Sequence, residues 1–323
     1  MEKAILSGNE AIARGFYEAG GRFASAYPGT PSTEILENIG QYDEIQAQWA
    51  PNEKVALEVA GGAALGGARS LAAMKHVGLN VAAGPLFSLS YQGTNAGIVI
   101  ISADDPSMHS SQNEQDNRWY ARAAKIPMLE PSDSQEAKDF TALALELSEK
   151  YDTPILLRTT TRINHSKSIV TLNERKAVAR KEYKKDFLKN VLLPTNAKKK
   201  HVLVEKRLME LEAYGSSCDC NRIEWGDKKL GIITGGISYQ YAREVFPAAS
   251  ILKLGLTHPL PKKMVRQFAG KVEKIYVIEE LDPFLEEQIA GMGIQVEGKN
   301  RLPNIDELNP EIIAQAFGLE SPP

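Results

Sequence analysis

The sequence predicts an α/β protein, a doubly wound parallel sheet followed by a smaller α/β domain. Short apolar runs such as residues 98–101 are typical of buried parallel strands. They alternate with helical segments, which favours parallel strands with helices on both faces. The same alternation resumes near residue 230, after a charged stretch. We therefore expect a first domain at 1–165, a basic linker with helices at 166–228, and a smaller domain at 229–323.

Composition gives no sign of a nucleic-acid or membrane partner. The 323 residues are 43% hydrophobic and 24% charged, with a net charge of −3, as in ordinary soluble proteins. Residues 77–103 carry no charge, but Asn80, Pro85 and Gln92 interrupt them, so we expect protein interior rather than a membrane span. Cys218 and Cys220 are too few and too close for a disulfide framework or a four-ligand metal site. A reducing cytoplasm is the expected location.

The first elements lead to a polar loop. Ser7 or Asn9 is expected to cap a helix that ends at Gly20 and Gly21. A strand over 22–27 then delivers the loop 27–33, YPGTPST, to a second helix. Loops at the carboxyl ends of parallel strands often bind ligands. A plain turn with Ser32 or Thr33 as N-cap explains the same residues, so both interpretations stay open.

The stretch 49–80 contains an unusual helix. Asn52 is a suitable N-cap, which places Glu53 in the first turn, where a carboxylate compensates the helix dipole. Four glycines at 61, 62, 66 and 67 would cost about 4 kcal/mol of helix propensity relative to alanine. Such a cost suggests a close approach by another helix, a subunit or a flat ligand. Glu53 would then be buried at an interface and available for proton transfer.

Further strands end in polar residues. A strand over 70–74 leads to Lys75 and His76, and a lone histidine is more often structural than catalytic. The run 98–101 leads to a loop that includes Asp104, Asp105 and residues 108–113, and loops of this length tend to be functional. A strand at 127–129, a helix capped by Ser132 or Ser134, and a strand at 154–159 complete the domain.

The linker is strongly basic. Residues 174–207 hold 12 Lys or Arg against 4 Asp or Glu, a local excess of +8. Only Tyr183 and Phe187 interleave as aromatics, and no base-reading motif occurs, so we expect a solvated linker rather than a nucleic-acid arm.

Three motifs of the remaining chain have an ordinary explanation. Thr234-Gly235-Gly236 opens onto a helix and could bind an anion, but a tight turn explains it without a ligand. Glu279-Glu280 could be an acid–base pair, and a hydrated acidic edge is the simpler expectation. Gly61 and Gly66 have the spacing of a nucleotide-binding P-loop, but Gly67 replaces its lysine, which argues against kinase or ATPase chemistry.

Several long motifs resemble one known family. They are YPGTPSTEI from Tyr27, NEKVALEVAGGAALGGARSLAAMKHVGLN from Asn52, DDPSMHSSQNEQDNRWYARAAKIPMLEPSDSQEAKD from Asp104, and LKLGLTHPLP and VIEELDPFLEEQ near the end. Together they resemble the N-terminal half of the large (alpha) subunit of indolepyruvate:ferredoxin oxidoreductase, a thiamine-diphosphate-dependent 2-oxoacid:ferredoxin oxidoreductase. The resemblance implies a pyrimidine-binding domain of the thiamine-diphosphate fold, followed by a smaller domain like the transketolase C-terminal domain.

The resemblance also implies roles for individual residues. Glu53 would be the catalytic acid that hydrogen-bonds the aminopyrimidine ring of the cofactor. Thr30 and His76 would contact substrate. Pro28, Gly29 and Lys75, together with Glu53, would contact the cofactor. Gly84 departs from the family pattern, which usually has an acidic residue there.

The implied reaction is oxidative decarboxylation of indolepyruvate or another aryl pyruvate, with electrons passed to ferredoxin and the acyl group to coenzyme A. Mg²⁺ and 4Fe-4S clusters are expected only on a missing domain or partner, because Gly226-Asp227 runs into Lys228 and two cysteines cannot hold a cluster. We therefore expect a homo- or hetero-oligomer in which the cofactor site is shared with the missing domain or partner. The alternative is a non-catalytic structural or regulatory subunit that keeps the fold.

Overall fold

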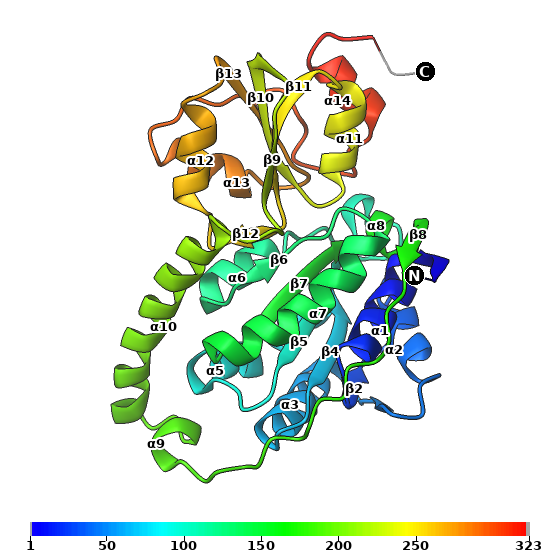
Figure 1. Ribbon diagram of the computed structural model, residues 1–323, viewed down its shortest axis with the longest axis vertical. Coiled ribbons are helices and arrows are strands. Elements are labelled where there is room, and N and C mark those ends of the chain that lie inside the picture. The colour runs from blue at the N-terminus through cyan, green and yellow to red at the C-terminus, as the bar shows by residue number, and fades with distance from the viewer. Residues whose placement is uncertain (1, 321–323) are drawn as a thin grey trace.

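The computed structural model describes residues 2–320, which contain three sheets. The two larger sheets lie one above the other along the long axis (Figure 1), and the third has two strands. The larger sheet has seven strands in the order β12-β6-β7-β5-β4-β2-β3. Every neighbouring pair is parallel except β12 and β6. The strands are β2 (Phe23–Ala26), β3 (Gln46–Trp49), β4 (Ser70–Lys75), β5 (Ile98–Asp104), β6 (Met128–Leu129), β7 (Ile155–Thr160) and β12 (Leu256–His258).

Helices cover both faces of this sheet. Side chains alternate along β4 and β5, so Met74 and Ile100 pack on one face while Ala73 and Ile101 pack on the other. The first face contacts α3 (Glu53–Leu65), α4 (His76–Val81), α5 (Ala83–Gln92) and α6 (Arg118–Ala124). The second contacts α1 (Gly8–Glu18), α2 (Thr33–Ile39) and α7 (Ser134–Tyr151). The predicted doubly wound sheet is confirmed.

Side-chain caps fix where the helices begin. Ser7 and Glu10 form a reciprocal capping box at α1, in which Glu10 N–H donates to Ser7 Oγ at 3.2 Å. Asn52 Oδ1 accepts from Val55 N–H at 2.9 Å, as the sequence predicted for α3. The expected cap of α7 was wrong, because Asp133 accepts from Glu136 N–H. Ser132 instead donates to the Glu136 carboxylate.

The glycine-rich stretch is shorter as a helix than the sequence suggested. Helix α3 ends at Leu65, Gly66 is its C-cap, and Gly67 has φ +89°. Gly67 therefore terminates the helix in the left-handed region, where glycine is favoured. The Lys181 carbonyl approaches its Cα so closely that a side chain could not fit. Only Gly61 and Gly62 weaken the helix interior, so the expected propensity cost falls to about 2 kcal/mol.

The smaller sheet has the order β13-β10-β11-β9. Its strands are β9 (Arg222–Glu224), β10 (Asp227–Gly235), β11 (Ala249–Leu254) and β13 (Lys274–Ile278), with helices α11 (Ser238–Val245), α12 (Lys262–Ala269), α13 (Phe284–Ala290) and α14 (Pro310–Ala316). The expected strand after α13 was wrong. Only an isolated bridge between Tyr276 and Glu297 forms, and α14 follows.

The segment that connects the larger sheet to the smaller one runs along the outside of the larger sheet (Figure 1). A short helix α8 (Thr161–His165) leads to β8 (Lys167–Thr171), which pairs with the unexpected N-terminal strand β1 (Lys3–Ser7). The basic segment then runs without a helix to α9 (Phe187–Asn190), held by backbone bonds from Lys176 to Glu18 and from Lys181 to Gly67. The long helix α10 (Pro194–Gly215) rises from α9 towards the smaller sheet. None of the helices within residues 2–320 is long and apolar enough to cross a membrane.

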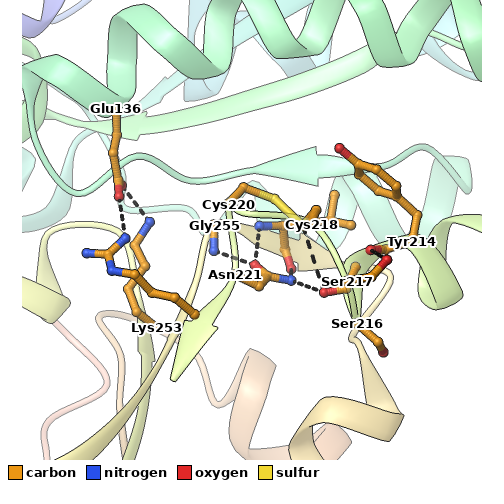
Figure 2. The surroundings of a disulfide bond; sticks show 12 residues. Glu136, Tyr214, Ser216, Ser217, Cys218, Cys220, Asn221, Lys253 and Gly255 are labelled. Atoms are coloured by element: carbon orange, nitrogen blue, oxygen red, sulfur yellow. Dashed lines mark hydrogen bonds and ion pairs between the residues drawn. A yellow bond between two sulfur atoms is a disulfide. The ribbon is translucent and has the colours of Figure 1, made fainter. Parts of the chain in front are cut away.

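Cys218 and Cys220 form one disulfide between α10 and β9 (Figure 2). A single bond between residues two apart is compatible with the sequence argument against a framework of several bridges, but the pairing itself was not expected. Both side chains are buried. The following residue, Asn221, fixes the turn before β12, because its Oδ1 accepts from Gly255 N–H at 2.7 Å and Leu256 N–H at 2.9 Å.

Candidate functional site

Four adjacent strands of the larger sheet end at one edge, and each is followed by a polar segment. In spatial order these strands are β5, β4, β2 and β3. They lead respectively to the loop 105–117, hereafter the site loop, to Lys75-His76, to the loop 27–32, and to Glu53 at the start of α3. The carboxyl edge of a parallel sheet therefore brings all the sequence-predicted site residues to one region.

Glu53 lies at the first position of α3 and is 9% exposed. Its side chain lies against the backbone of α4: a Cβ added to Gly78 would come within 2.6 Å of Glu53 Oε1. Glycine at position 78 therefore creates the space that the carboxylate uses. Among residues 2–320, no side chain or backbone N–H is hydrogen-bonded to this carboxylate, and no cation pairs with it. A nearly buried carboxyl group of this kind can form a hydrogen bond with a ligand.

The loop after β2 presents Pro28 and Thr30 at the surface. Both residues are exposed, whereas Pro31 and Ser32 are buried. Gly29 anchors the loop, since its N–H donates to Thr33 Oγ1 at 2.9 Å and its carbonyl accepts from Ser32. Ser32 occupies the N-cap position of α2 but makes no side-chain cap bond. The turn interpretation therefore accounts for residues 29–33 and leaves Thr30 free to contact a ligand.

Lys75 lies beside this loop. A Cβ on Gly29 would be 3.0 Å from Lys75 Cδ, so the lysine stem and the Gly29 backbone are in contact. Lys75 Nζ donates to the Ser110 carbonyl of the site loop at 2.9 Å. Burial lowers the pKa of Lys75, against the attraction of Asp105. The structure brings Pro28, Gly29, Thr30 and Lys75 together on the same edge as Glu53.

The position of His76 differs from the substrate contact that the family resemblance implies. Its side chain is 0% exposed. Nε2 lies 3.0 Å from the Asn113 carbonyl, and Asn117 Nδ2 donates to the His76 carbonyl at 3.0 Å. Direct contact with a substrate is excluded in this conformation, because the site loop covers the ring. His76 Nδ1 is buried, and no partner for it lies within residues 2–320.

A groove separates α3 from α5 next to this edge. It has a volume of about 430 Å³, and Gly61, Gly62, Gly84 and Pro85 line it together with Lys54 and Glu58. Gly61 approaches Leu89 of α5, whereas Gly62 and Gly84 face open space, with no atom within 4 Å of an added Cβ. Close helix approach thus explains Gly61, and Gly62 and Gly84 form an exposed surface without side chains.

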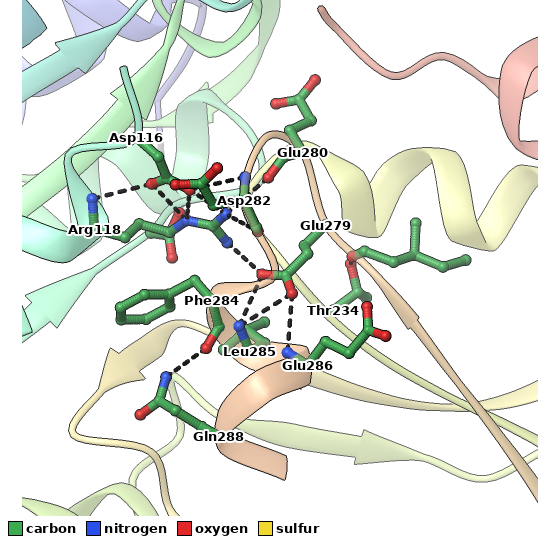
Figure 3. A network of polar contacts seen from close by, with 12 residues as sticks. Asp116, Arg118, Thr234, Glu279, Glu280, Asp282, Phe284, Leu285, Glu286 and Gln288 are labelled. Carbon is green, nitrogen blue, oxygen red and sulfur yellow. Dashed lines mark hydrogen bonds and ion pairs between the residues drawn. The ribbon is translucent and has the colours of Figure 1, made fainter. Parts of the chain in front are cut away.

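The pair Glu279-Glu280 was expected at a hydrated acidic edge, and that expectation was wrong. The two residues are 2% and 4% exposed. Figure 3 shows Arg118 directed at this segment, with Nη1 2.6 Å from Glu279 Oε2 and Nη2 bonded to the Glu280 and Asp282 carbonyls. Arg118 and the N–H groups of Leu285 and Glu286 provide the Glu279 carboxylate with the hydrogen bonds that water would make at an exposed position.

Sequence reasoning missed the buried arginines that organise this region. Arg118 also binds Asp116 at 2.5 Å, and Arg158 binds Asp104 and Glu130, each at 2.9 Å. A signal existed for Arg158, because it is the single charge in the apolar strand β7. Burial raises the pKa of Asp104, against the attraction of Arg158. Thr234 and Gly235 end strand β10, and a tight turn begins at Gly236, which has φ +56°. Thr234 Oγ1 donates to the Ile278 carbonyl.

The fold is shared with two proteins of known structure. A 2-oxoglutarate:ferredoxin oxidoreductase from Magnetococcus marinus, solved with 2-oxoglutarate, coenzyme A and succinyl-CoA bound, superposes with a TM-score of 0.77. The match covers 98% of this chain and 65% of that one, at 18% identity. A split gene transketolase in an inactive β4 tetramer gives a TM-score of 0.64 at 13% identity, over 98% and 94% of the two chains. At these identities the likeness establishes the fold.

The sequence comparisons identify the family. A family model described as pyruvate flavodoxin/ferredoxin oxidoreductase, thiamine diP-bdg, matches residues 14–214. The chain belongs to this family, and the resemblance found in its motifs is confirmed. It is 46% identical to the indolepyruvate oxidoreductase subunit IorA of Archaeoglobus fulgidus over 92% of this chain and 50% of the relative. It is 41% identical to IorA of Methanothermobacter thermautotrophicus over 100% and 55%. The chain thus spans about half the length of these relatives and corresponds to their N-terminal half.

Proposed function

We propose that this chain supplies the pyrimidine-binding part of a thiamine-diphosphate-dependent 2-oxoacid:ferredoxin oxidoreductase that acts on indolepyruvate or another aryl pyruvate. The observation that carries the proposal is the Glu53 carboxylate, nearly buried at the carboxyl edge of the sheet and without a hydrogen-bond donor among the described residues. The names of the IorA relatives support the substrate class.

The residues at this edge fit the aminopyrimidine half of the cofactor. When bound, thiamine diphosphate supplies a nucleophilic carbon that adds to the 2-oxo group and accepts the electrons left by decarboxylation. Glu53 would hold a proton in a hydrogen bond to a pyrimidine nitrogen and thereby favour the reactive tautomer. Pro28, Gly29 and Lys75 would contact the cofactor, and Thr30 would bind the substrate.

The diphosphate half of the cofactor requires other groups. Within residues 2–320, no cluster of three or more His, Cys, Asp or Glu side chains could hold a metal ion. We propose that a diphosphate-binding and iron–sulfur domain or subunit supplies Mg²⁺ and the 4Fe-4S clusters and docks on the groove between α3 and α5. That assembly would pass electrons to ferredoxin and the acyl group to coenzyme A.

The test compares this chain alone with the complex isolated from its native source, whose subunits are identified by mass spectrometry. The complex should reduce ferredoxin with indolepyruvate and coenzyme A, whereas the chain alone should not. Robust turnover by the chain alone would overturn the shared site. A complex that binds thiamine diphosphate but oxidises no 2-oxoacid would instead favour a structural or regulatory subunit.

A further inference from the structure

The site loop is held by both domains at once. Its inner side faces the proposed cofactor site, where the Ser110 carbonyl accepts from Lys75 Nζ and the Asn113 carbonyl lies 3.0 Å from His76 Nε2. Its outer side faces residues 306–307 of the smaller domain. A displacement of the loop would therefore shift the partners of Lys75, the last residue of β4, and of His76, the first residue of α4.

The outer contacts centre on Ser107 and Glu114. Glu114 Oε1 accepts from Ser107 N–H at 2.7 Å within the loop and from Asp306 N–H at 3.1 Å across the interface. Ser107 Oγ accepts from Glu307 N–H at 2.9 Å. These four residues form a closed set of hydrogen bonds, which we call the latch.

The latch holds Ser107 in a backbone conformation that non-glycine residues seldom adopt. Ser107 has φ +67° and Met108 has φ +51°, and Asp306 across the interface has φ +68°. Non-glycine residues stay in the left-handed region only where surrounding contacts fix them. Here the Ser107 N–H and hydroxyl are both bonded within the latch, so the smaller domain contributes directly to the loop conformation.

A second set of contacts reinforces the same arrangement. The Glu307 carboxylate lies 3.4 Å from His109 Nε2 and 2.7 Å from Arg162 Nη2. Thr161 Oγ1 donates to Asp105 at 2.7 Å, and Asp105 accepts from Ser110 N–H and Ser111 Oγ. The first half of the site loop is thus tied to the smaller domain and to α8.

We propose that Glu114 is a positioning residue for the 2-oxoacid reaction: through the latch, the smaller domain sets the site loop and hence Lys75 and His76. This inference rests on the proposed function for its catalytic consequence. The latch itself is a property of the chain and is testable without any cofactor.

Glu114→Ala removes the acceptor for Ser107 and Asp306 N–H. Hydrogen exchange of the full chain should then be faster in residues 105–117 by on the order of tenfold, with exchange in β4 and β5 unchanged. Glu114→Gln keeps one side-chain oxygen as acceptor and should restore protection. The matched control is Glu311→Ala, at an exposed position of α14, which removes one negative charge from the smaller domain without touching the loop. Unchanged exchange in Glu114→Ala would overturn the latch.

The kinetic arm uses the reconstituted complex. Because the Lys75 stem contacts Gly29, the neighbour of Thr30, Glu114→Ala should raise KM for indolepyruvate by on the order of tenfold, and Glu114→Gln should return KM towards the wild-type value. A general loss of folded enzyme would lower turnover and leave KM unchanged. Faster exchange with an unchanged KM would overturn the positioning role. A wild-type complex without 2-oxoacid activity would refute the proposed function and, with it, the positioning role, and the exchange data would still decide whether the latch exists.

Discussion

At the amino end of α3, Glu53 combines burial with freedom from any partner in the described chain. Most acidic side chains that are buried here have a cation or several N–H groups, as Glu279 does with Arg118 and Leu285. The dipole of α3 stabilises a carboxylate at this position, but it does not explain why Gly78 leaves room for the side chain. A ligand that forms a hydrogen bond with Glu53 explains both features.

Glu53→Gln tests this role, because glutamine has nearly the same shape and cannot serve as the acid. We expect an unchanged fold and a loss of turnover on the order of a hundredfold or more in the reconstituted complex. Steady-state kinetics and a circular dichroism spectrum of the variant provide the measurement. Unchanged turnover would return Glu53 to a purely helix-dipole role.

Elements that depend on neighbours in sequence could be predicted, and those that depend on distant partners could not. The caps Ser7 and Asn52 act within three residues, so the sequence alone locates α1 and α3. Strand β1 pairs with β8, far along the chain, and was missed. Glu279 is buried because of Arg118, 161 residues away, and no local pattern indicates that compensation.

In the candidate site too, the features set by local sequence could be predicted and those set by distant contacts could not. Sheet topology places Thr30, Lys75 and Glu53 on one edge, as the order of strands and loops in the sequence suggested. The burial of His76 depends on how the site loop folds back over it, which involves Asn113 and Asn117. The glycine surface that the sequence predicted was too long, because Gly66 and Gly67 end helix α3 rather than extend its surface.

In the pair of helices α3 and α5, two substitutions of Gly62 should distinguish an effect on stability from an effect on assembly. Its missing Cβ points into open space, so Gly62→Ala should raise the free energy of unfolding by about 0.5–1 kcal/mol through helix propensity. Gly62→Leu should also fold, but the larger side chain would fill the groove and weaken binding of the partner domain by on the order of tenfold or more. Thermal unfolding and sedimentation of the complex measure the two effects. Equal assembly of both variants would rule out this groove as the docking surface.

Across the whole molecule, the two domains meet through charged groups that have lost most of their water. Arg118 joins α6 to the Glu279 segment, and Lys253 of β11 pairs with Glu136 of α7 (Figure 2). Breaking one partner of such a pair leaves a buried charge uncompensated, which is costly. These pairs therefore favour one relative placement of the domains, the condition that the latch on the site loop requires.

Glu280 makes the stability of this interface depend on pH. Burial raises its pKa from 4.5 to about 7, against the attraction of Arg158. Between these values the folded chain binds a proton at Glu280 that the unfolded chain has lost. Stability from this group is therefore complete below about pH 4.5 and is lost as the pH rises through about 7, a change of up to about 3 kcal/mol.

Glu280→Gln should abolish that loss, because the glutamine oxygen can still accept from Leu308 N–H, as Glu280 Oε1 does at 3.0 Å, and no charge forms in the interior. The variant should match the wild type in urea unfolding near pH 5 and exceed it by about 2–3 kcal/mol near pH 8. Glu311→Gln, at an exposed position of α14, controls for the general effect of removing one negative charge. Parallel stability profiles for Glu280→Gln and the wild type would show that Glu280 is ionised in the folded chain throughout this range, and that the attraction of Arg158 outweighs the cost of burial.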